Sequence, residues 1–423
     1  MEKEKVTYDL PFILLCVLAV INSLKPEFII PGLESIGIIR QIPNIIVGML
    51  FLLWLAQGQK VFHNKQTKFY LAFFLLMVID TALARNPERA FLITKGFTAG
   101  VMWYLAMIGF VDDFAKLKKL INIFLVCNIF IAFLGIKSGG LVHNIPALCD
   151  ENDFSLLMNM LIPFSFFYGM EAGRMRGKIF YYGITALFIT GVIVSFSRGG
   201  FVGLFFTLLY CFSKIQKKAV FIFMSLLVAV SVYFFAPQGY WKEMATIQQQ
   251  GTQEGTAKRR IYLWKNGLRI FVHHPVFGVG PYNSGVWVTT YDKTEQGARD
   301  WGRALHSIYF TLLSELGLIG TFLFFAIIYY GERDKKYIIK LYMNKSLIEN
   351  NPNIPDLKKE SLSKQVRESY FLSLALTGAL IGYLSSGIFL SVLYYGWFWK
   401  IMTYTVILFN LTNKTLEHPD KTG

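Results

Sequence analysis

The stretch IYFTLLSELGLIGTFLFFAIIYY, residues 308–330, decides the fold class of this chain. It contains one charged residue, Glu315, and it is long enough to cross a bilayer, which takes roughly 20 mostly apolar residues as a helix. Similar runs recur along the 423 residues, of which 54% are hydrophobic and 16% are charged. Because membrane strands alternate apolar and polar residues, these continuous runs predict an all-α integral membrane protein.

The apolar runs predict about twelve transmembrane helices, and the segments between them divide the chain. We expect N-terminal transmembrane helices in residues 1–190, a core in 191–330 that includes a long loop at 236–305, a charged, solvated cytoplasmic loop at 331–369, and C-terminal transmembrane helices with a tail in 370–423. The predicted spans are residues 10–24, 43–57, 69–84, 91–111, 120–136, 154–170, 179–196, 199–212, 220–235, 308–330, 371–389 and 392–411.

The formal net charge of +15 comes from basic residues that are spread over the connections between spans. Lysines and arginines gather in alternate connections, as at Lys116, Lys118 and Lys119, and cytoplasmic loops carry such an excess. The pattern therefore predicts that both termini are cytoplasmic and that the large loop at 236–305 is periplasmic. It favours topology over nucleic-acid binding as the reason for the charge.

The predicted periplasmic loop is longer than the other external connections. Loops of this length in compact proteins are usually functional. Within it, residues 258–272 have apolar side chains at three- and four-residue spacing, which is typical of a helix. We expect one apolar stripe that lies against the membrane surface or the bundle, formed by Ile261, Trp264, Leu268 and Phe271.

Two arginine positions are candidates for binding an anion. Arg198 stands in SFSRGG, residues 195–200, where the glycines would let backbone amides and a helix N-terminus approach a phosphate. A snorkelling arginine at a tight turn is the alternative. Arg259 and Arg260 precede Trp264, and a guanidinium suits bidentate phosphate binding, although a solvated basic face would give the same pattern.

His306 is the candidate general base, because it ends the long loop and opens the next span. Imidazole is the usual base near neutral pH, although a lone interfacial histidine is more often structural. Glu315 lies nine residues further, on the opposite side of a helix from His306. We therefore expect Glu315 to be a buried structural carboxylate paired with another helix.

Further polar residues are weaker candidates. Asp150, Glu151 and Asp153 precede a predicted span, where helix capping accounts for them, although they could also contact a sugar acceptor. His273 and His274 have no obvious third ligand nearby. We expect no metal site and no cofactor.

Five short strings occur in a fixed order through the core of the chain. They are SFSRG (195–199), RIYLW (260–264), HPVFGVG (274–280), HS (306–307) and ELGLIG (315–320). In order and placement they resemble the O-antigen ligase and polymerase superfamily. The resemblance covers residues 191–321, and the form of the string that follows His306 is similar to the branch of O-glycosylation ligases. Asn often follows the histidine in the family, whereas Ser307 does so here.

The resemblance implies a metal-independent, inverting glycosyltransferase in the bacterial cytoplasmic membrane, with its active site at the periplasmic face. It would take a glycan from a polyprenyl-diphosphate carrier such as undecaprenyl diphosphate, as in polysaccharide or lipopolysaccharide biosynthesis for the cell envelope. The acceptor would be a lipid, a protein or a glycan. Carried over by motif, His306 would be the catalytic base, and Arg198 and Arg260 would bind the donor diphosphate.

Two alternatives remain open at this point. A polymerase would use a second lipid-linked glycan as its acceptor and would need no different motif. A transporter or flippase of lipid-linked sugar would belong to a different class. The single elaborated loop and the placement of the motifs on one face disfavour a transporter, because its site must be reachable from both sides of the membrane.

Overall fold

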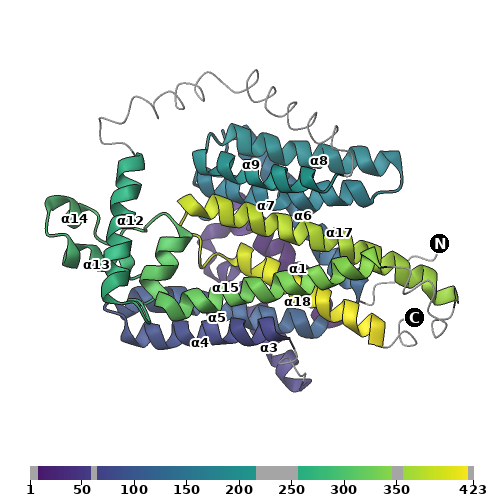
Figure 1. Ribbon diagram of the computed structural model, residues 1–423, viewed down its shortest axis with the longest axis horizontal. Helices are drawn as coiled ribbons and strands as arrows, with labels where there is room; N and C mark the ends of the chain where they lie inside the picture. The colour runs from purple at the N-terminus through teal and green to yellow at the C-terminus, as the bar shows by residue number, and fades with distance from the viewer. Residues whose placement is uncertain (1–7, 59–63, 216–255, 345–355, 418–423) are drawn as a thin grey trace.

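The protein is described here by a computed structural model that covers residues 8–58, 64–215, 256–344 and 356–417. Within these ranges every regular element is a helix (Figure 1). The helices are α1 (Leu10–Leu24), α2 (Pro26–Ile29), α3 (Gly37–Ala56), α4 (Lys65–Leu83), α5 (Pro87–Phe110), α6 (Phe114–Lys137), α7 (Glu151–Glu171), α8 (Met175–Val194), α9 (Arg198–Ser213), α12 (Thr256–His273), α13 (Ser284–Tyr291), α14 (Glu295–Arg299), α15 (Ile308–Met343), α17 (Asp356–Ser386) and α18 (Gly396–Glu417).

Each predicted span that falls in the described residues coincides with one of these helices, which confirms the all-α membrane class. The predicted span at 220–235 lies outside them. Eight of the described helices are long and apolar enough to cross a membrane, and α9 is a shorter apolar helix. The predicted number of about twelve spans is therefore not confirmed. Helix α7 is not among the eight, and every residue from Phe154 to Gly169 is buried because α6, α8, α9 and α17 pack around it.

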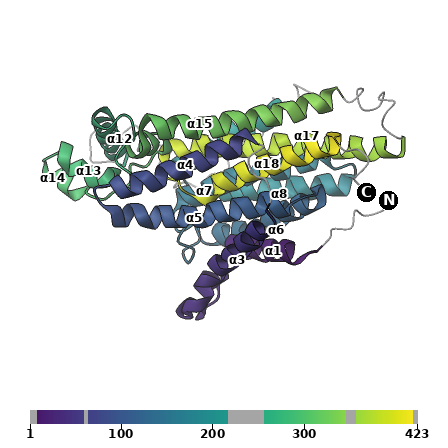
Figure 2. The same cartoon turned by 90° about the horizontal axis from the view of Figure 1, so that it is seen from below.

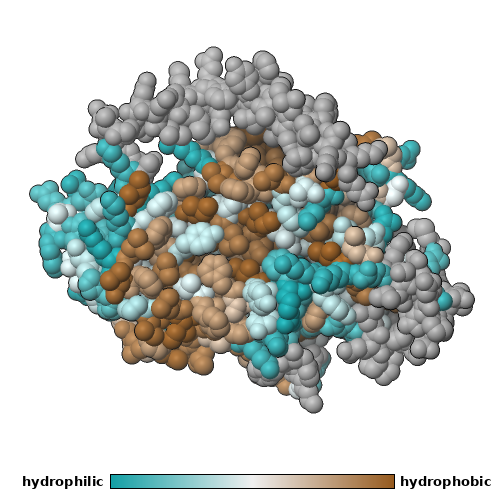
Figure 3. Space-filling model, in the orientation of Figure 1, coloured by the Kyte–Doolittle hydropathy of each residue, from teal (hydrophilic) through white to brown (hydrophobic). Residues whose placement is uncertain are grey.

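The long helices lie alongside one another, and α12, α13 and α14 gather at one end of the bundle (Figures 1 and 2). The face of the molecule seen in Figure 3 is hydrophobic over its middle and hydrophilic over α12–α14. An apolar belt with a polar end is what a bilayer requires of a protein that crosses it. On this face the loop helices therefore form a polar end beside the apolar middle of the bundle.

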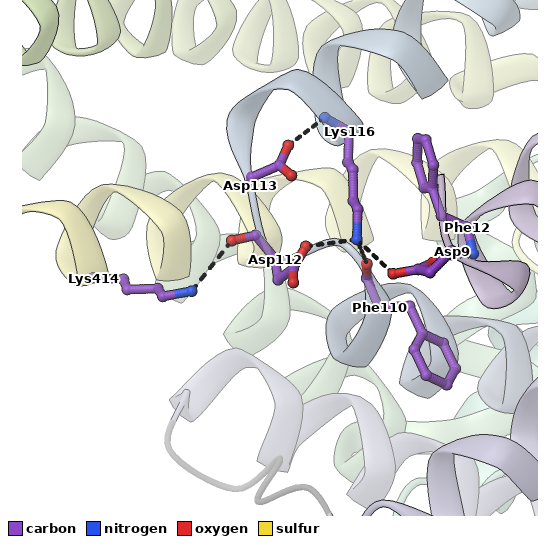
Figure 4. Close-up of polar contacts among 7 residues, drawn as sticks. All are labelled: Asp9, Phe12, Phe110, Asp112, Asp113, Lys116 and Lys414. Carbon is purple, nitrogen blue, oxygen red and sulfur yellow. Dashed lines mark hydrogen bonds and ion pairs between the residues drawn. The ribbon is translucent and has the colours of Figure 1, made fainter. Parts of the chain in front are cut away.

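Lysines hold the opposite end of the bundle together. Lys116 Nζ lies 3.0 Å from Asp9 Oδ2 and 2.9 Å from Asp112 Oδ1, so that its side chain points between the two carboxylates (Figure 4). Lys414 Nζ donates to the carbonyl oxygen of Asp112 at 3.4 Å. These contacts bring together the start of α1, the turn between α5 and α6, and the last turns of α18. Connections that the sequence predicts to be cytoplasmic thus meet at one end.

Within the charged stretch 331–369, predicted to be a solvated loop, residues 331–343 and 356–369 are helical, and residues 345–355 lie outside the described ranges. Helix α15 continues to Met343, and α17 already begins at Asp356. An ion pair and a hydrogen bond accommodate two of these charges: Lys335 Nζ lies 2.6 Å from Glu332 Oε1 one turn earlier, and Asp334 accepts a hydrogen bond from Asn64 Nδ2 at 3.3 Å. Because these charged side chains have protein partners, they do not require full solvation, and the residues can form helices.

Helix α15 is interrupted at Gly317, whose φ of 60° and ψ of −158° lie in a region that essentially only glycine occupies. The interruption frees backbone groups on both sides of Gly317, and the segment 275–280 satisfies them. Backbone hydrogen bonds join the two segments, namely Val279 N to Ser314 O at 3.0 Å, Gly280 N to Glu315 O at 2.9 Å, Leu318 N to Pro275 O at 2.8 Å and Ile319 N to Val276 O at 3.2 Å.

The carboxylate of Glu315 attaches the same loop to the bundle by its side chain. Glu315 is 2% exposed, and it accepts hydrogen bonds of 2.7 Å from the backbone amide of Tyr282, the hydroxyl of Ser284 and the hydroxyl of Tyr394. The expectation of a buried structural carboxylate is confirmed, although its partners come from the loop, α13 and the start of the α18 segment. Three donors are what a buried carboxylate needs.

We predict that Gly317→Ala strongly destabilises the protein. The new Cβ would lie 2.4 Å from the carbonyl oxygen of Val276, and the backbone conformation alone costs a residue other than glycine about 1–3 kcal/mol. Gly183→Ala in α8 is the matched control, because its Cβ meets nothing within 4 Å and alanine is favoured in helices by about 0.5–1 kcal/mol.

The measurement is the thermal unfolding midpoint of the detergent-solubilised protein. The midpoint should fall for Gly317→Ala and stay equal or rise slightly for Gly183→Ala. A midpoint for Gly317→Ala at the wild-type value would show that the interruption of α15 is not a structural requirement.

Candidate active site

The junction between α8 and α9 places Arg198 at the first position of a helix. Phe196 adopts a positive φ of 53°, which turns the chain sharply after α8. Ser197 then caps α9: its hydroxyl accepts from the amide of Gly200 at 2.9 Å and donates to Asn152 Oδ1 at 2.7 Å. The turn is therefore tied to the first turn of α7, and Arg198 projects from a fixed helix start.

Glycines on α9 bring this helix against its neighbours. A Cβ at Gly200 would lie 2.4 Å from Ser155 Oγ of α7, and a Cβ at Gly203 would lie 1.9 Å from Ser386 Oγ of α17. Asn159 of α7 donates to the carbonyl oxygen of Gly200 at 2.8 Å. Small residues and interhelical polar contacts are how helices approach closely within a membrane. The glycines that follow Arg198 thus serve packing as well as the local turn.

Helix α12 confirms the predicted helix in the loop, and two residues of the predicted apolar stripe are not buried against the bundle. Ile261 is 49% exposed and Leu268 is 43% exposed, whereas Leu263 and Ile270 are buried on a different face. This face packs on α15 and α13. Trp264 does contact the bundle, because its indole stacks on Phe310 of α15 with ring centroids 5.1 Å apart. The side chains that bind the bundle were not distinguishable by spacing, since both faces of the helix carry apolar residues.

Arg259 and Arg260 have different surroundings. Arg259 is bound to the buried carboxylate of Asp300, to which its Nε donates at 3.1 Å, and Arg303 Nε lies 3.2 Å from the same carboxylate. These ion pairs hold α12 to the segment after α14. The guanidinium of Arg260 instead lies over the ring of Phe389, 5.8 Å from its centroid. Arg260 is therefore the one of the two that faces the bundle.

Phe389 connects the two candidate arginines. A Cβ at Gly199, next to Arg198, would lie 3.3 Å from Cβ of Phe389, the ring of which lies under Arg260. Burial lowers the pKa of Arg260; the carboxylate of Asp150 raises it, and the charge of Arg198 lowers it. The structure thus brings both arginines into electrostatic reach of one another, as expected for a shared anion site.

His306 lies at the same end of the bundle, between the loop and α15. Its φ of 52° is positive, and its backbone amide donates to the hydroxyl of Ser391 at 2.7 Å. The side chain reaches solvent, but the surrounding protein still removes water and lowers its pKa; the guanidinium of Arg260 lowers it further, while Asp150 raises it. An imidazole with a pKa below the ordinary value of about 6.5 is neutral at pH 7 and can accept a proton.

The acidic residues at the start of α7 cap the helix and also act electrostatically on the candidate site. Asp150 caps α7 by accepting from the amide of Asn152 at 2.8 Å, so the capping interpretation is confirmed. Its charge also acts on Arg260 and on His306, and Glu151 acts on Arg260. The sequence could have indicated this role, because arginines that lie close together need acidic residues nearby, and Asp150 and Glu151 are acidic residues next to a predicted span.

The turn between α17 and α18 adds three residues to the candidate site that the sequence did not indicate: Phe389, Ser391 and Tyr395. Tyr395 donates to Asp153 at 3.3 Å and so joins this turn to α7. The string around Phe389 is apolar and carries no chemical signal. Only the fold places it beside residues nearly two hundred positions earlier in the chain.

A cavity of ≈290 Å³ is lined in part by Leu305, which precedes His306 in the chain, and by Ser391, Arg303, Tyr394 and Tyr395; His306 itself is not among its lining residues. The histidines at the end of α12 lie elsewhere: His274, which follows the helix, bonds to the hydroxyl of Tyr291 through Nε2 at 3.1 Å. Across the described ranges, no group of three or more His, Cys, Asp or Glu side chains is placed to hold a metal ion.

The family described as O-Antigen ligase matches residues 183–325, from α8 to the middle of α15. No curated protein matches the chain. The matched segment contains the α8–α9 junction, α12 and the start of α15, which together supply Arg198, Arg260 and His306. The match indicates a multi-pass membrane enzyme of O-antigen ligase or polymerase type, with a lipid-linked glycan and an acceptor as its partners. Over residues 183–325 the chain is therefore similar to the O-antigen ligase family.

Proposed function

We propose that the protein transfers a glycan from a polyprenyl-diphosphate carrier to a hydroxyl acceptor at the periplasmic face of the bacterial cytoplasmic membrane. Arg198 and Arg260 bind the donor diphosphate, His306 is the general base, and the transfer inverts the anomeric centre without a metal ion. The observation that carries the proposal is the convergence of two arginines from separate helices beside a histidine with a lowered pKa.

The arginines suit a lipid diphosphate because of where they lie. The donor has a tail that must stay in the bilayer and a charged group that must stay at its surface, and Arg198 and Arg260 stand at helix starts at the polar end of the bundle. Two guanidinium groups can each form bidentate bonds to phosphate oxygens. Asp150 and Glu151 supply the opposite charge until the donor arrives.

The proposed reaction is a displacement at the anomeric carbon of the donor glycan. The acceptor hydroxyl attacks this carbon, and His306 takes its proton as the new glycosidic bond forms. The bond to the diphosphate oxygen breaks, and the diphosphate leaves with the electron pair. Arg198 and Arg260 neutralise the charge that develops on the leaving group. A single displacement of this kind inverts the anomeric configuration.

A polysaccharide polymerase remains the second candidate, because a lipid-linked acceptor would use the same residues. Transport of lipid-linked sugar is the less favoured alternative. The arginines, the histidine and the adjoining cavity all lie at one end of the bundle, whereas a transporter site must be reachable from both ends.

The periplasmic placement predicts a labelling pattern in intact cells. In a variant without native cysteines, Glu295→Cys on α14 should react with an impermeant thiol reagent, whereas Lys336→Cys on α15 should react only after permeabilisation. Both positions are exposed, and Lys336 lies on the stretch assigned to the cytoplasm by its lysines and arginines. Labelling of position 336 but not 295 in intact cells would reverse the topology.

For the arginines, we predict that Arg260→Lys and Arg198→Ala weaken binding of a polyprenyl-diphosphate donor and slow its turnover. A lysine keeps the charge but cannot form the bidentate fork, and loss of a charge-assisted hydrogen bond costs about 1.5–3 kcal/mol, or roughly 10- to 100-fold. Arg269→Lys, an exposed position on the same helix as Arg260, is the control and should bind normally. Normal donor binding and turnover by both test variants would refute the diphosphate site.

For the base, we predict that His306→Ala folds and binds donor but transfers glycan about 10² to 10⁴ times more slowly. The pH dependence gives an independent measurement. The neutral imidazole is the active form, so kcat/KM should fall on acidification, with its midpoint below about pH 6.5 because burial and Arg260 lower the pKa of His306. A folded His306→Ala protein with transfer within a few-fold of wild type would exclude the base role.

A further inference from the structure

A second cavity, of ≈450 Å³, lies among α1, α3, α5, α6 and α18. Its size falls in the usual range for a bound small molecule, about 300–1,000 Å³. Its wall carries side-chain amides from Asn22, Asn44 and Asn128. It is also rich in aromatic rings: Trp103, Trp397, Trp399, Tyr70, Phe97 and Phe124.

Two lysines face this cavity without an acidic partner. Lys25 and Lys400 both line it, and their charges act on one another. The ammonium of Lys400 lies over the ring of Phe124, 4.4 Å from the centroid. Among the described residues, no carboxylate lies within 4 Å of either lysine, and Glu27, two positions after Lys25, pairs with neither. Like charges that share a cavity repel, and a bound anion would offset this cost.

The cavity meets the first cavity, of ≈290 Å³. Gly96, Phe97, Tyr394 and Tyr395 line both. The cavity of ≈290 Å³ in turn reaches Ser391, the hydroxyl of which accepts from the backbone amide of His306. Arg198 and Arg260, by contrast, flank Phe389. The two cavities are therefore available to a molecule other than the donor diphosphate.

We propose that the lysine cavity binds the acceptor, and that the acceptor is a glycan carrying an anionic group, either a carboxylate or a phosphate. Aromatic rings would stack on the C–H faces of the sugar rings, the amides would bond to hydroxyl groups, and Lys400 with Lys25 would bind the anion. This inference rests on the proposed function, because it assigns the lysine cavity to the acceptor of that transfer. It adds a requirement for acidic sugar that the transfer chemistry itself does not impose.

The test measures the binding of model sugars to the purified full-length protein in detergent, with tryptophan fluorescence as the readout. The anionic probes are α-1,4-digalacturonate and trehalose 6-phosphate, and their neutral counterparts are α-1,4-galactobiose and trehalose. At least one anionic probe should bind about 10-fold or more tightly than its counterpart, since a charge-assisted bond is lost in the neutral sugar. The probe that binds distinguishes a carboxylate from a phosphate.

Lys400→Gln and Lys25→Gln should each remove most of this preference, and Lys336→Gln, an exposed lysine at the opposite end of the bundle, should keep it. His306→Ala should also keep the preference for the anionic sugar. Failure of the acceptor proposal, measured by sugar binding, is therefore separate from failure of the base assignment, measured by glycan transfer. Equal binding of anionic and neutral probes would overturn the proposal, as would a preference that survives in both lysine variants. A fluorescence response to phosphatidylglycerol with none to either anionic sugar would identify a lipid site instead.

Discussion

The site depends on the interruption of α15 at Gly317. A helix that loses backbone hydrogen bonds inside a membrane must recover them from protein, since lipid offers no partner. The segment 275–280 supplies them, and the carboxylate of Glu315 binds the backbone and side chain of the residues that follow. The loop between α12 and α15 is therefore fixed to the transmembrane bundle along its length. This attachment positions α12, and hence Arg260, relative to the helix that His306 precedes.

The electrostatics of the site follow from this arrangement. Arg198 and Arg260 approach one another although both are positively charged, and Asp150 and Glu151 lie close enough to act on Arg260. Arg260 also lowers the pKa of His306, so the charge that would attract a diphosphate also favours the neutral imidazole that the proposed base requires. Arg259, in contrast, is occupied by Asp300 and maintains the fold of the loop. These neighbouring arginines thus have different partners because they lie on different faces of α12.

The sequence predicted the helical class, the positions of the long helices and the three residues that converge, because apolar runs and motif order are local properties. It did not predict that α12 packs through Leu263 and Ile270, since its apolar residues lie on both faces. Nor did it predict Phe389 and Ser391, which have no distinctive spacing and reach the site only through the packing of α17. The helices within 331–369 were missed because the charge count conceals ion pairs such as Lys335 with Glu332.

His306 lies between the loop and α15 and contacts Ser391 in the turn before α18. Its φ of 52° is positive, which is uncommon for residues other than glycine, although histidine adopts it more readily than most. Here the hydroxyl of Ser391 accepts from its backbone amide, and the adjoining Ser307 is buried at the start of α15. The backbone of His306 is thereby fixed within electrostatic reach of Arg260 and next to Leu305, which lines the cavity of ≈290 Å³. In the proposed reaction the base must stand between the leaving group and the acceptor, and the hydrogen bond to Ser391 is what fixes the backbone of His306.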